Sequence, residues 1–483
     1  MAILGISSLD HDASVALVDG DSILFAGHAE RYSRVKNDGM VNEDLINDVY
    51  QYGEIESIVW YETPMLRKMR YLKAGQWGGL NKPSVKCHLD ELGLEGLPVS
   101  FVSHHESHAA GGYYTSGFDR AAVVVCDAIG ELDTISVWLA EGKSLRRVWK
   151  TSYPHSLGLL YSAFTKRIGY KPNEEEYILM GMAAYGEPKY AREIEQDFLA
   201  SHDHRFILKE NVHRGIQWWR PDITDIADIA ASIQKVTEDY LVRLMTWVRE
   251  TTGETNLVYM GGVALNCVAN SKITGLFDRI WIMPNPGDAG SSLGAVAAKT
   301  REQISWTSPY LGHNIRDPLN RRGAIELLKR GEVIGVAHGR AEFGPRAFGN
   351  RSLLCDPRGP LMKDRVNAIK KRDAFRPFAP IVLDHLADQY FDMPARDNRY
   401  MQYVSRVKEP HLFPAITHHD GTARVQTLSR NDNPIFYDLL DHWYHETGCP
   451  MLLNTSLNIK GEPLVNTRED ANRFSDLYGI RVF

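Results

Sequence analysis

The residues of this chain best suited to chemistry are histidines and aspartates that stand beside short apolar runs. One such run is followed by the segment VSHHESHAAGGYY (102–114), in which His104 and His108 are four residues apart. In a helix, this spacing places both imidazoles on one face. The pair is therefore either part of a metal site or the polar start of an ordinary helix, and only ligands from elsewhere in the chain can decide.

Two aspartates are positioned to supply those ligands. Asp127 comes directly after the apolar run AAVVVC, and Asp288 lies in the loop MPNPGDAGSSLGA, after the apolar run IWIM. Proteins with α/β folds gather ligands at the ends of their strands. Two carboxylates and two imidazoles would form an N₂O₂ donor set, which accepts Fe²⁺, Mn²⁺ or Zn²⁺ and leaves room for substrate or water.

A further histidine, His11, occupies the turn HDAS between two predicted strands at 2–7 and 14–19. Because the pKa of an imidazole lies near neutrality, His11 is a candidate general base. The alternative is an ordinary turn histidine beside Asp12.

Glycines at two places suit a nucleotide. The segment YMGGVALN (259–266) has two glycines between a predicted strand and a helix, where the backbone can approach a ligand closely. The loop around Asp288 offers backbone N–H groups and a helix N-terminus to phosphate. The first segment is not a Walker A loop, because it lacks the G-K-[ST] sequence.

The second half of the chain is rich in arginine. Four segments carry basic or amide side chains among glycines and prolines: GRAEFGPRAFGNRSLLCDPRG (339–359), KKRDAFRPFAP (370–380), HHDGTARVQT (418–427) and NTSLNIKGEP (454–463). Arginine-dense loops of this kind suit multidentate recognition of phosphate. A solvated basic face is the alternative, but it would not need the glycines and prolines.

An α/β fold must position these residues. Short apolar runs predict strands at 2–7, 14–19, 23–30, 57–61, 99–102, 121–126, 134–139, 257–260 and 280–283. A period close to 3.6 predicts a helix over 225–252, with Gly253 at its end. The polar, proline-bearing stretch 301–325 is the best candidate for a domain boundary, and a second αβ unit follows it, with strands near 333–339 and 450–454.

The composition limits the class of protein. A chain of 483 residues is long enough for two or three domains, and 55 basic against 61 acidic residues argue against binding to polyanions over the whole surface. Five scattered cysteines without a C-x-x-C motif indicate reduced thiols. We expect a cytoplasmic protein without a signal peptide or membrane segment, because no basic leader and no apolar run of about 20 residues is present.

Taken in order, the segments resemble the O-carbamoyltransferases of the NodU/CmcH type. The similarity runs nearly from end to end, through HDAS, AERYSRVKND, HHESHAA, DAIGE, ILMGMAAYG, GGVALN, NPGDAGSSLGA, GRAEFGPRAFGNRS, FRPFAP, HHDGTARVQT and NTSLNIKGEP. GPRAFGNRS, FRPFAP and NTSLN are highly specific in combination.

The resemblance implies an α/β protein with two domains. Residues 1–310 would have the actin-like ATPase fold of the sugar kinase/Hsp70 superfamily, similar to the universal tRNA threonylcarbamoyl transferase subunit, and residues 325–483 would form a YrdC-like α/β domain. In such enzymes the YrdC-like domain makes carbamoyl adenylate from carbamoyl phosphate and ATP. The other domain transfers the carbamoyl group to an acceptor hydroxyl at a divalent metal.

The resemblance also implies roles for residues. His104, His108, Asp127 and Asp288 would bind the metal, foremost Fe²⁺ with Mn²⁺ or Zn²⁺ as alternatives, and His11 would activate the acceptor. ATP, with Mg²⁺, and carbamoyl phosphate are the implied co-substrates. The implied contacts to nucleotide or carbamoyl adenylate are Lys36, Gly261, Gly262, Asn266, Gly287 and Gly290. Those to carbamoyl phosphate and ATP are Arg346, Lys370, Arg372, Arg376, Arg424, Asn454 and Ser456.

The chain departs from the family pattern at two places. Ala128 replaces a turn glycine in DAIGE, which puts the backbone geometry there in question, and Ile178 stands where a lysine is usual, so that a phosphate contact must be lost or replaced.

The acceptor stays open. The family favours a hydroxyl of a sugar or another small natural product. Against it stands the stretch 62–86, with six basic residues, one acid, Tyr71 and Trp77, and a similar strip at 213–221. Basic residues with interleaved aromatics suit a hydroxymethylated pyrimidine nucleotide or nucleic acid base, whereas the alternative is a solvated loop whose aromatics pack inward.

Rival functions are an actin-like sugar kinase or ATPase and a nucleotide-binding regulator without catalysis. We expect a monomer or homodimer with no membrane partner.

Overall fold

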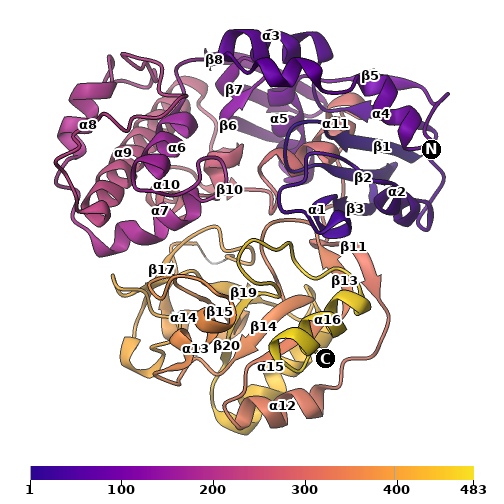
Figure 1. Ribbon diagram of the computed structural model, residues 1–483, viewed down its shortest axis with the longest axis vertical. Coiled ribbons are helices and arrows are strands. Elements are labelled where there is room, and N and C mark those ends of the chain that lie inside the picture. Colours follow the sequence, from indigo (N-terminus) through magenta and orange to yellow (C-terminus); the bar gives the residue numbers. More distant parts are fainter. Residues whose placement is uncertain (1, 396) are drawn as a thin grey trace. The chain divides into compact units, whose positions relative to one another are not determined.

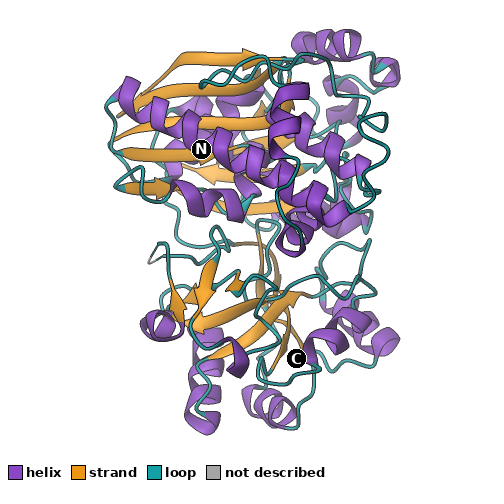
Figure 2. Cartoon of the chain, turned by 90° about the vertical axis from the view of Figure 1, so that its left-hand side faces the viewer, coloured by secondary structure: helices purple, strands orange, loops and turns teal. Residues whose placement is uncertain are grey.

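The computed structural model describes residues 2–395 and 397–483 and divides the chain into two compact units. Unit 1 contains the residues up to Ala29 and Asn37–Trp306, and unit 2 contains Glu30–Lys36 and Thr307–Phe483. Both units combine helices and strands, so the chain has a mixed α/β structure (Figures 1 and 2).

The first sheet of unit 1 has the strand order β3-β2-β1-β4-β5. Its strands are β1 (Ala2–Ser7), β2 (Ser14–Asp19), β3 (Ser22–His28), β4 (Ser57–Trp60) and β5 (Val99–Phe101). The first three strands pair antiparallel, with Ile6 opposite Val15, while β4 and β5 continue the sheet in parallel, with Ile6 beside Trp60. Apolar side chains on both faces of β1 and β2 are buried, as expected for an inner strand.

The second sheet of unit 1 repeats this plan. Its order is β10-β9-β6-β7-β8, with β6 (Arg120–Gly130), β7 (Asp133–Glu141), β8 (Ser144–Ser152), β9 (Asn256–Met260) and β10 (Arg279–Trp281). Strands β6, β7 and β8 pair antiparallel, and β9 and β10 are added in parallel beside β6. The two halves of unit 1 therefore have the same strand order and the same strand directions.

Two helices lie between the sheets (Figure 1). Helix α5 (His104–Thr115) follows β5 of the first sheet and packs on β6 and β9 of the second, whereas α11 (Ser291–Thr300) follows β10 and packs on β1 and β2. Small residues allow the two helices to cross closely, because a methyl group at Gly294 would overlap the Ser107 carbonyl oxygen. The small residues predicted after the Asp288 loop thus serve close packing.

Further helices cover the outer faces of unit 1. They are α2 (Glu43–Tyr50), α3 (Pro64–Ala74), α4 (Val85–Glu91), α6 (Leu157–Arg167), α7 (Glu176–Met182), α8 (Ala191–Phe198), α9 (Ile226–Thr252) and α10 (Cys267–Ile273). Helix α9 begins at the cap Asp225, which accepts from the backbone N–H groups of Ala227 and Asp228, and ends at Gly253 with φ of 70°. The helix predicted over 225–252 is confirmed.

Unit 2 is built on a sheet with the order β12-β14-β20-β15-β19. Its strands are β12 (Ile334–Ala337), β14 (Arg351–Cys355), β20 (Met451–Ser456), β15 (Ala379–Leu383) and β19 (Gln426–Leu428). Smaller sheets are formed by β11 (Tyr310–Ile315) with β13 (Gly339–Glu342), and by β16 (Phe391–Asp392), β17 (Ser405–Val407) and β18 (Thr422–Ala423). The helices are α1 (Glu30–Ser33), α12 (Arg321–Lys329), α13 (Met362–Ile369), α14 (Ala387–Tyr390), α15 (Pro434–Thr447) and α16 (Arg468–Tyr478).

The short segment 30–36 is fixed to unit 2 by arginines that donate to backbone carbonyls. Buried Arg31 donates to the carbonyls of Glu342 and Gly344, and Arg34 donates to those of Pro463 and Leu464. These bonds tie the segment to β13 and to the loop before α16, so the segment completes the second unit. It had been expected within the first domain, 1–310.

The apolar runs predicted as strands are confirmed as β1 to β7, β9, β10, β12 and β20. Two regions differ from the expectation of loops. Part of the stretch 62–86 forms α3 and α4, and the arginine-rich stretch 339–359 contains β13 and β14. In the part of the chain that the structure describes, no helix combines the length and apolarity that a membrane crossing requires.

Candidate active site

The candidate site of unit 1 is assembled from equivalent points of its two halves. Each half provides the hairpin after its first strand and the segment after its last strand. The first half gives His11, in the β1–β2 turn, and His104, at the start of α5 after β5. The second half gives Asp127, near the end of β6, and Asp288, in the turn after β10. Pairing of β6 with β7 is interrupted between Cys126 and Gly130, which frees Asp127 to point out of the ladder.

Four side chains predicted as metal ligands converge in this site. The Nε2 atoms of His104 and His108 are 3.1 Å apart, and each lies close to both carboxylates. His104 Nε2 is 3.2 Å from Asp127 Oδ2 and 3.2 Å from Asp288 Oδ1, while the corresponding distances from His108 Nε2 are 3.5 and 3.3 Å. All four ligand atoms lie within 4.8 Å of one another.

This donor set fits a divalent metal. Five of its six atom pairs are separated by 3.1–3.5 Å. A tetrahedron with edges of that length has its centre about 2 Å from each corner, which is the length of metal bonds to imidazole nitrogen and carboxylate oxygen. Nitrogen and oxygen donors without a thiolate suit Fe²⁺, Mn²⁺ or Zn²⁺.

The electrostatics of the cluster favour a cation. Burial opposes the charged form of each imidazole, but the carboxylates outweigh burial, so the pKa values of His104 and His108 are raised. Burial likewise opposes the charged carboxylates, yet the two histidines hold the pKa of Asp127 well below its ordinary value. Buried carboxylates this close together need positive charge, which a metal ion supplies.

His11 lies at the open side of the cluster. Its Nε2 is 3.4 Å from Asp288 Oδ2, and 55% of its side chain is exposed, against 1% for His104. Burial opposes the charged form of the ring, but Asp288 and Asp12 raise the pKa of His11 to about 10. A cation held by Asp288 would offset this carboxylate and bring the pKa back toward the range in which an imidazole accepts a proton. The flanking Leu9 and Asp12 have φ of 83° and 53°, a conformation that costs free energy in residues other than glycine and is common at functional sites.

His105 takes no part in the cluster. Its Nδ1 lies 2.8 Å from Ser136 Oγ, which is not a member of the cluster. Burial, followed by the charge of His104, lowers the pKa of His105 to about 3, so the ring is neutral. Of the three histidines in HHESH, the two that are four residues apart belong to the cluster, and His105 is a buried residue outside it.

The predicted glycines surround the carboxylates. The N–H of Gly262 donates to Asp127 Oδ1 at 3.1 Å, and the N–H of Gly261 donates to the Pro286 carbonyl, next to Gly287. Gly261 has φ of 92°, and a methyl group there would overlap the Cys126 carbonyl oxygen. Gly290 belongs to the same turn as Asp288. The glycines therefore allow the backbone to approach the two aspartates closely.

Two other residues predicted to contact nucleotide are engaged elsewhere. Asn266 caps α10 and exchanges hydrogen bonds with Gln234. Lys36 lies in the segment 30–36 of unit 2, where its ammonium bonds Glu30 at 2.7 Å. The glycines thus come together within unit 1, and the ammonium of Lys36 is paired within unit 2.

The predicted anion contacts of unit 2 gather around β20. Lys370, at the end of α13, donates to the carbonyl of Ser456 at 2.5 Å and to Asn458 at 2.8 Å. Burial, then repulsion from Arg372 and Arg376, lowers the pKa of Lys370 well below its ordinary value. Asn454 donates to the Ala347 carbonyl, which joins β20 to the loop of Arg346.

Two arginines of this group differ in their surroundings. Arg372 donates to Asn367 Oδ1 at 2.7 Å and lies over the ring of Phe378. Arg424 is buried, and its Nε has no hydrogen-bond partner among the described residues. A buried guanidinium N–H without a partner is costly, and an anionic ligand would satisfy it.

The two departures from the family pattern fit the backbone. Ala128 lies within β6, and the positive φ of this turn occurs at Glu131, so the turn does not need a glycine at 128. Ile178 is buried in α7.

Three residues near the cluster were not identified from the sequence as site residues: Glu62, Arg70 and Asp10. Glu62 Oε1 lies 3.0 Å from His104 Nδ1 and accepts from Arg70, which also donates to Asp10. Lys82 binds Asp10 as well. Two of the six basic side chains of 62–86, buried Arg70 and the more exposed Lys82, therefore bind carboxylates. Arg67 is also buried, and its Nε and Nη1 have no hydrogen-bond partner among the described residues. A nucleotide or nucleic acid acceptor at this stretch stays a prediction.

Comparison with known proteins identifies related sequences over most of the chain. The family model described as Carbamoyltransferase N-terminus matches residues 89–297, and that described as Carbamoyltransferase C-terminus matches 325–482. His104, His108, Asp127 and Asp288 lie within the first match.

Individual relatives match nearly end to end. An uncharacterized Synechocystis protein, sll1178, is 36% identical, with 98% of this chain and 93% of the relative covered. The 3'-hydroxymethylcephem-O-carbamoyltransferase of Amycolatopsis lactamdurans is 28% identical, with 97% and 95% covered. Among solved structures, full-length HypF in its phosphate- and nucleotide-bound form matches 62% of this chain and 55% of its own, at 15% identity and a TM-score of 0.36, which is too low to establish a shared fold.

Proposed function

Because this chain belongs to the carbamoyltransferase family of the NodU/CmcH type and is a transferase, we propose that it is an ATP-dependent O-carbamoyltransferase. It would convert carbamoyl phosphate and ATP to carbamoyl adenylate and transfer the carbamoyl group to an acceptor hydroxyl. The observation that carries the proposal is the buried cluster of two imidazoles and two carboxylates beside the more exposed His11.

We assign the first half-reaction to unit 2. Carbamoyl phosphate loses inorganic phosphate to water, and an oxygen of the resulting carbamate attacks the α-phosphorus of ATP, with pyrophosphate as the leaving group. Phosphates need cationic and N–H donors at their oxygens. Buried Arg424, with its unsatisfied Nε, supplies such a donor, whereas Lys370 and Arg372 are held by acceptors within unit 2.

The second half-reaction belongs to the cluster of unit 1. The acceptor oxygen attacks the carbamoyl carbon, AMP leaves with the electrons of the broken bond, and His11 accepts the hydroxyl proton at an imidazole nitrogen. A divalent metal held by His104, His108, Asp127 and Asp288 would supply Lewis acidity to the reacting oxygen. The turn that carries His11 is tied to Gly39 by the Leu9 N–H, which keeps the imidazole beside the cluster.

We further propose that unit 1 has the actin-like ATPase fold and that residues 325–483 form a YrdC-like domain. The repeated strand order of the two sheets supports the first assignment. Fe²⁺ is the metal we favour over Mn²⁺ and Zn²⁺.

For the acceptor, we propose a hydroxyl on a sugar or another small molecule. The relative from Amycolatopsis lactamdurans is named for a hydroxymethyl acceptor, which supports a neutral hydroxyl here. Arg70 and Lys82 are paired with carboxylates, which leaves fewer of the basic side chains of 62–86 for a nucleic acid strand.

The proposal is tested by identifying the products that the chain forms from ATP. With carbamoyl phosphate present, the chain should release pyrophosphate and AMP, whereas a sugar kinase would release ADP. Arg424→Ala should lower pyrophosphate release by about 10²-fold because an anion contact is lost. Arg430→Ala, at an exposed arginine of the same unit, is the control. ADP as the product would contradict the proposal.

A further inference from the structure

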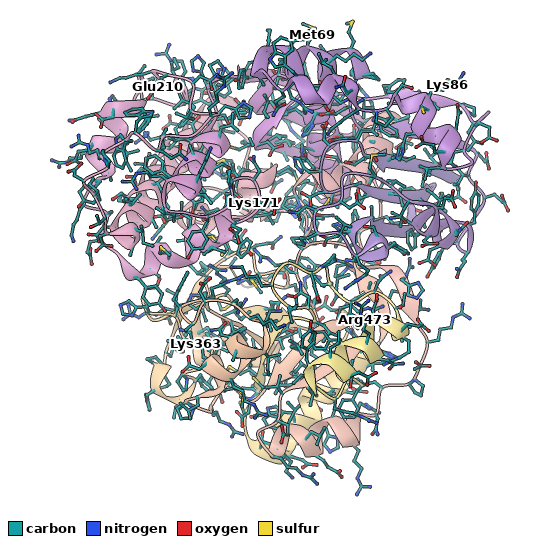
Figure 3. The ribbon with its side chains drawn as sticks, in the orientation of Figure 1. Met69, Lys86, Lys171, Glu210, Lys363 and Arg473 are labelled. Atoms are coloured by element: carbon teal, nitrogen blue, oxygen red, sulfur yellow. The ribbon has the colours of Figure 1, made fainter. Side chains whose placement is uncertain are left out.

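Helix α3 reverses the usual pattern of an amphipathic helix, because two of its arginines are buried and two of its methionines are exposed. Its buried residues are Arg67, Arg70 and Tyr71, while Met65 and Met69 on the opposite side are exposed. Figure 3 shows Met69 at the outer edge of the molecule, away from the sheets. Burial of arginine is costly unless the charge is paired, and Arg70 of this inner face is paired with two carboxylates.

Those carboxylates are Glu62 and Asp10. Arg70 Nη1 donates to Glu62 Oε1 at 2.8 Å, and its Nη2 donates to Asp10 Oδ2 at 2.6 Å. The Arg70 side chain is 7% exposed and that of Glu62 is 1% exposed. A single planar guanidinium thus bridges two carboxylates from different strand ends, which the point charge of a lysine cannot do in the same way.

Each carboxylate leads to one part of the candidate active site. Glu62 Oε1 lies 3.0 Å from His104 Nδ1, and the opposite nitrogen of the same ring, Nε2, faces Asp127 and Asp288. Asp10 precedes His11 in the strained turn, and it is held by Lys82 at 2.8 Å and by the Tyr71 hydroxyl as well as by Arg70.

We propose that Glu62 is a positioning residue for His104, and that Arg70 joins this ligand to the turn that carries His11. Glu62 accepts a hydrogen bond from Nδ1–H of His104, which leaves the lone pair on Nε2 for the metal. The same hydrogen bond fixes the plane of the ring. The inference rests on the proposed metal-binding role of the cluster.

The two histidine ligands differ in this respect. Among the described residues, His108 Nδ1 is contacted by Ser291 Oγ at 3.5 Å, whereas His104 Nδ1 lies 3.0 Å from the Glu62 carboxyl group. A carboxylate raises the basicity of an imidazole ligand more than a hydroxyl does. Of the two histidines, we therefore expect His104 to be the one whose affinity for the metal depends more on the residue bonded to its Nδ1.

The test measures binding of Co²⁺ alone to the full-length chain after removal of other metals with a chelator. Affinity is obtained by competition with a chelating dye, and the visible absorption of bound Co²⁺ reports the ligand geometry. Glu62→Gln should weaken Co²⁺ binding about 10- to 100-fold and shift the absorption bands. Ser291→Ala should have a smaller effect.

Asp133→Asn is the matched control for general loss of stability. Asp133 is a buried carboxylate of the same unit, paired with Arg147 and Lys150, and it has no contact with the cluster. Since it is independent of the metal, this variant should keep the affinity within about twofold of the wild type. Glu62→Asp, which retains the charge with a shorter reach, should bind with intermediate affinity and carries the test if Glu62→Gln does not fold.

The results separate this inference from the proposed function. If His108→Ala loses Co²⁺ while both Glu62 variants keep wild-type affinity and spectrum, the metal site stands and the positioning role is wrong. Equal weakening by Asp133→Asn would also overturn the role of Glu62, because the effect would then be structural. A wild-type chain that binds no Co²⁺ would refute the metal site itself and the inference with it.

Discussion

The two halves of unit 1 share a backbone plan but not a chemistry. Their sheets have the same strand order, and in both the candidate site receives side chains from the first hairpin and from the segment after the last strand. The first half places imidazoles there, His11 and His104 with His108, whereas the second half places the carboxylates Asp127 and Asp288. A repeated backbone can thus form one asymmetric site when its two copies carry different side chains at equivalent points.

The segments after the fourth strands show the same contrast. After β4, Glu62 and α3 bring a buried ion-pair network to the site, while after β9 the chain brings only Gly261 and Gly262. Side chains on one side hold the ring of His104, and bare backbone on the other approaches Asp127. One half therefore positions the site through charged side chains, and the other through close approach of its backbone.

The largest effect is expected when either half loses a ligand. His108→Ala and Asp288→Asn should each reduce carbamoyl transfer by about 10³-fold, because each removes a contact to charge that develops in the transition state. Transfer is measured with labelled carbamoyl phosphate. Both variants should still fold. They should also still release pyrophosphate, because we assign that half-reaction to unit 2. Full activity of one variant would show that its half of the site is dispensable.

His11 distinguishes the first half further. His11→Ala should slow transfer about 10²-fold or more, the usual loss when a general base is removed, and leave both adenylate formation and metal content unchanged. Single-turnover transfer from supplied carbamoyl adenylate is the measurement. An equal loss of both half-reactions would contradict the division between the units.

Gly261 tests the close backbone approach in the second half. Gly261→Ala should lower the free energy of unfolding by about 1–3 kcal/mol, because a side chain is strained at φ of 92° and its methyl group overlaps the Cys126 carbonyl. Gly253→Ala is the control, since its φ is 70° but nothing lies within 4 Å. Urea denaturation should show the smaller loss for the control, and equal losses would remove the packing argument.

The smallest effect is expected for Arg70→Lys. The charge remains, but lysine cannot bridge Glu62 and Asp10 with two parallel N–H donors, so the turn of His11 should loosen. We expect a fall in kcat of about tenfold, the cost of slight misplacement of a reacting group. Lys68→Arg, at an exposed position of the same helix, should leave kcat unchanged.

Much of unit 1 could be predicted from the sequence. Apolar runs identified the strands, and polar residues directly after those runs identified His104, Asp127 and Asp288, because α/β folds gather ligands at strand ends, which here belong to two sheets. The pairing of Glu62 with His104 could not be predicted, since the two are 42 residues apart and no local pattern links them.

Helix α3 was missed for a physical reason. Its exposed methionines and buried arginines reverse the usual pattern, so the basic residues of 62–86 were interpreted as a surface. Lys36 and Lys370 show a related limit. Their charges suited an anion, but the structure gives them internal acceptors, Glu30 for one and the Ser456 and Asn458 carbonyls for the other.

The central claim is that the two halves of unit 1 meet at one divalent metal. Its most direct test is the metal content of the full-length chain, purified without oxygen in the presence of Fe²⁺ and analysed by mass spectrometry of the elements. The account predicts one tightly bound metal ion per wild-type chain and a large loss in both His104→Ala, from the first half, and Asp127→Asn, from the second. A full equivalent of metal retained in either variant would contradict it.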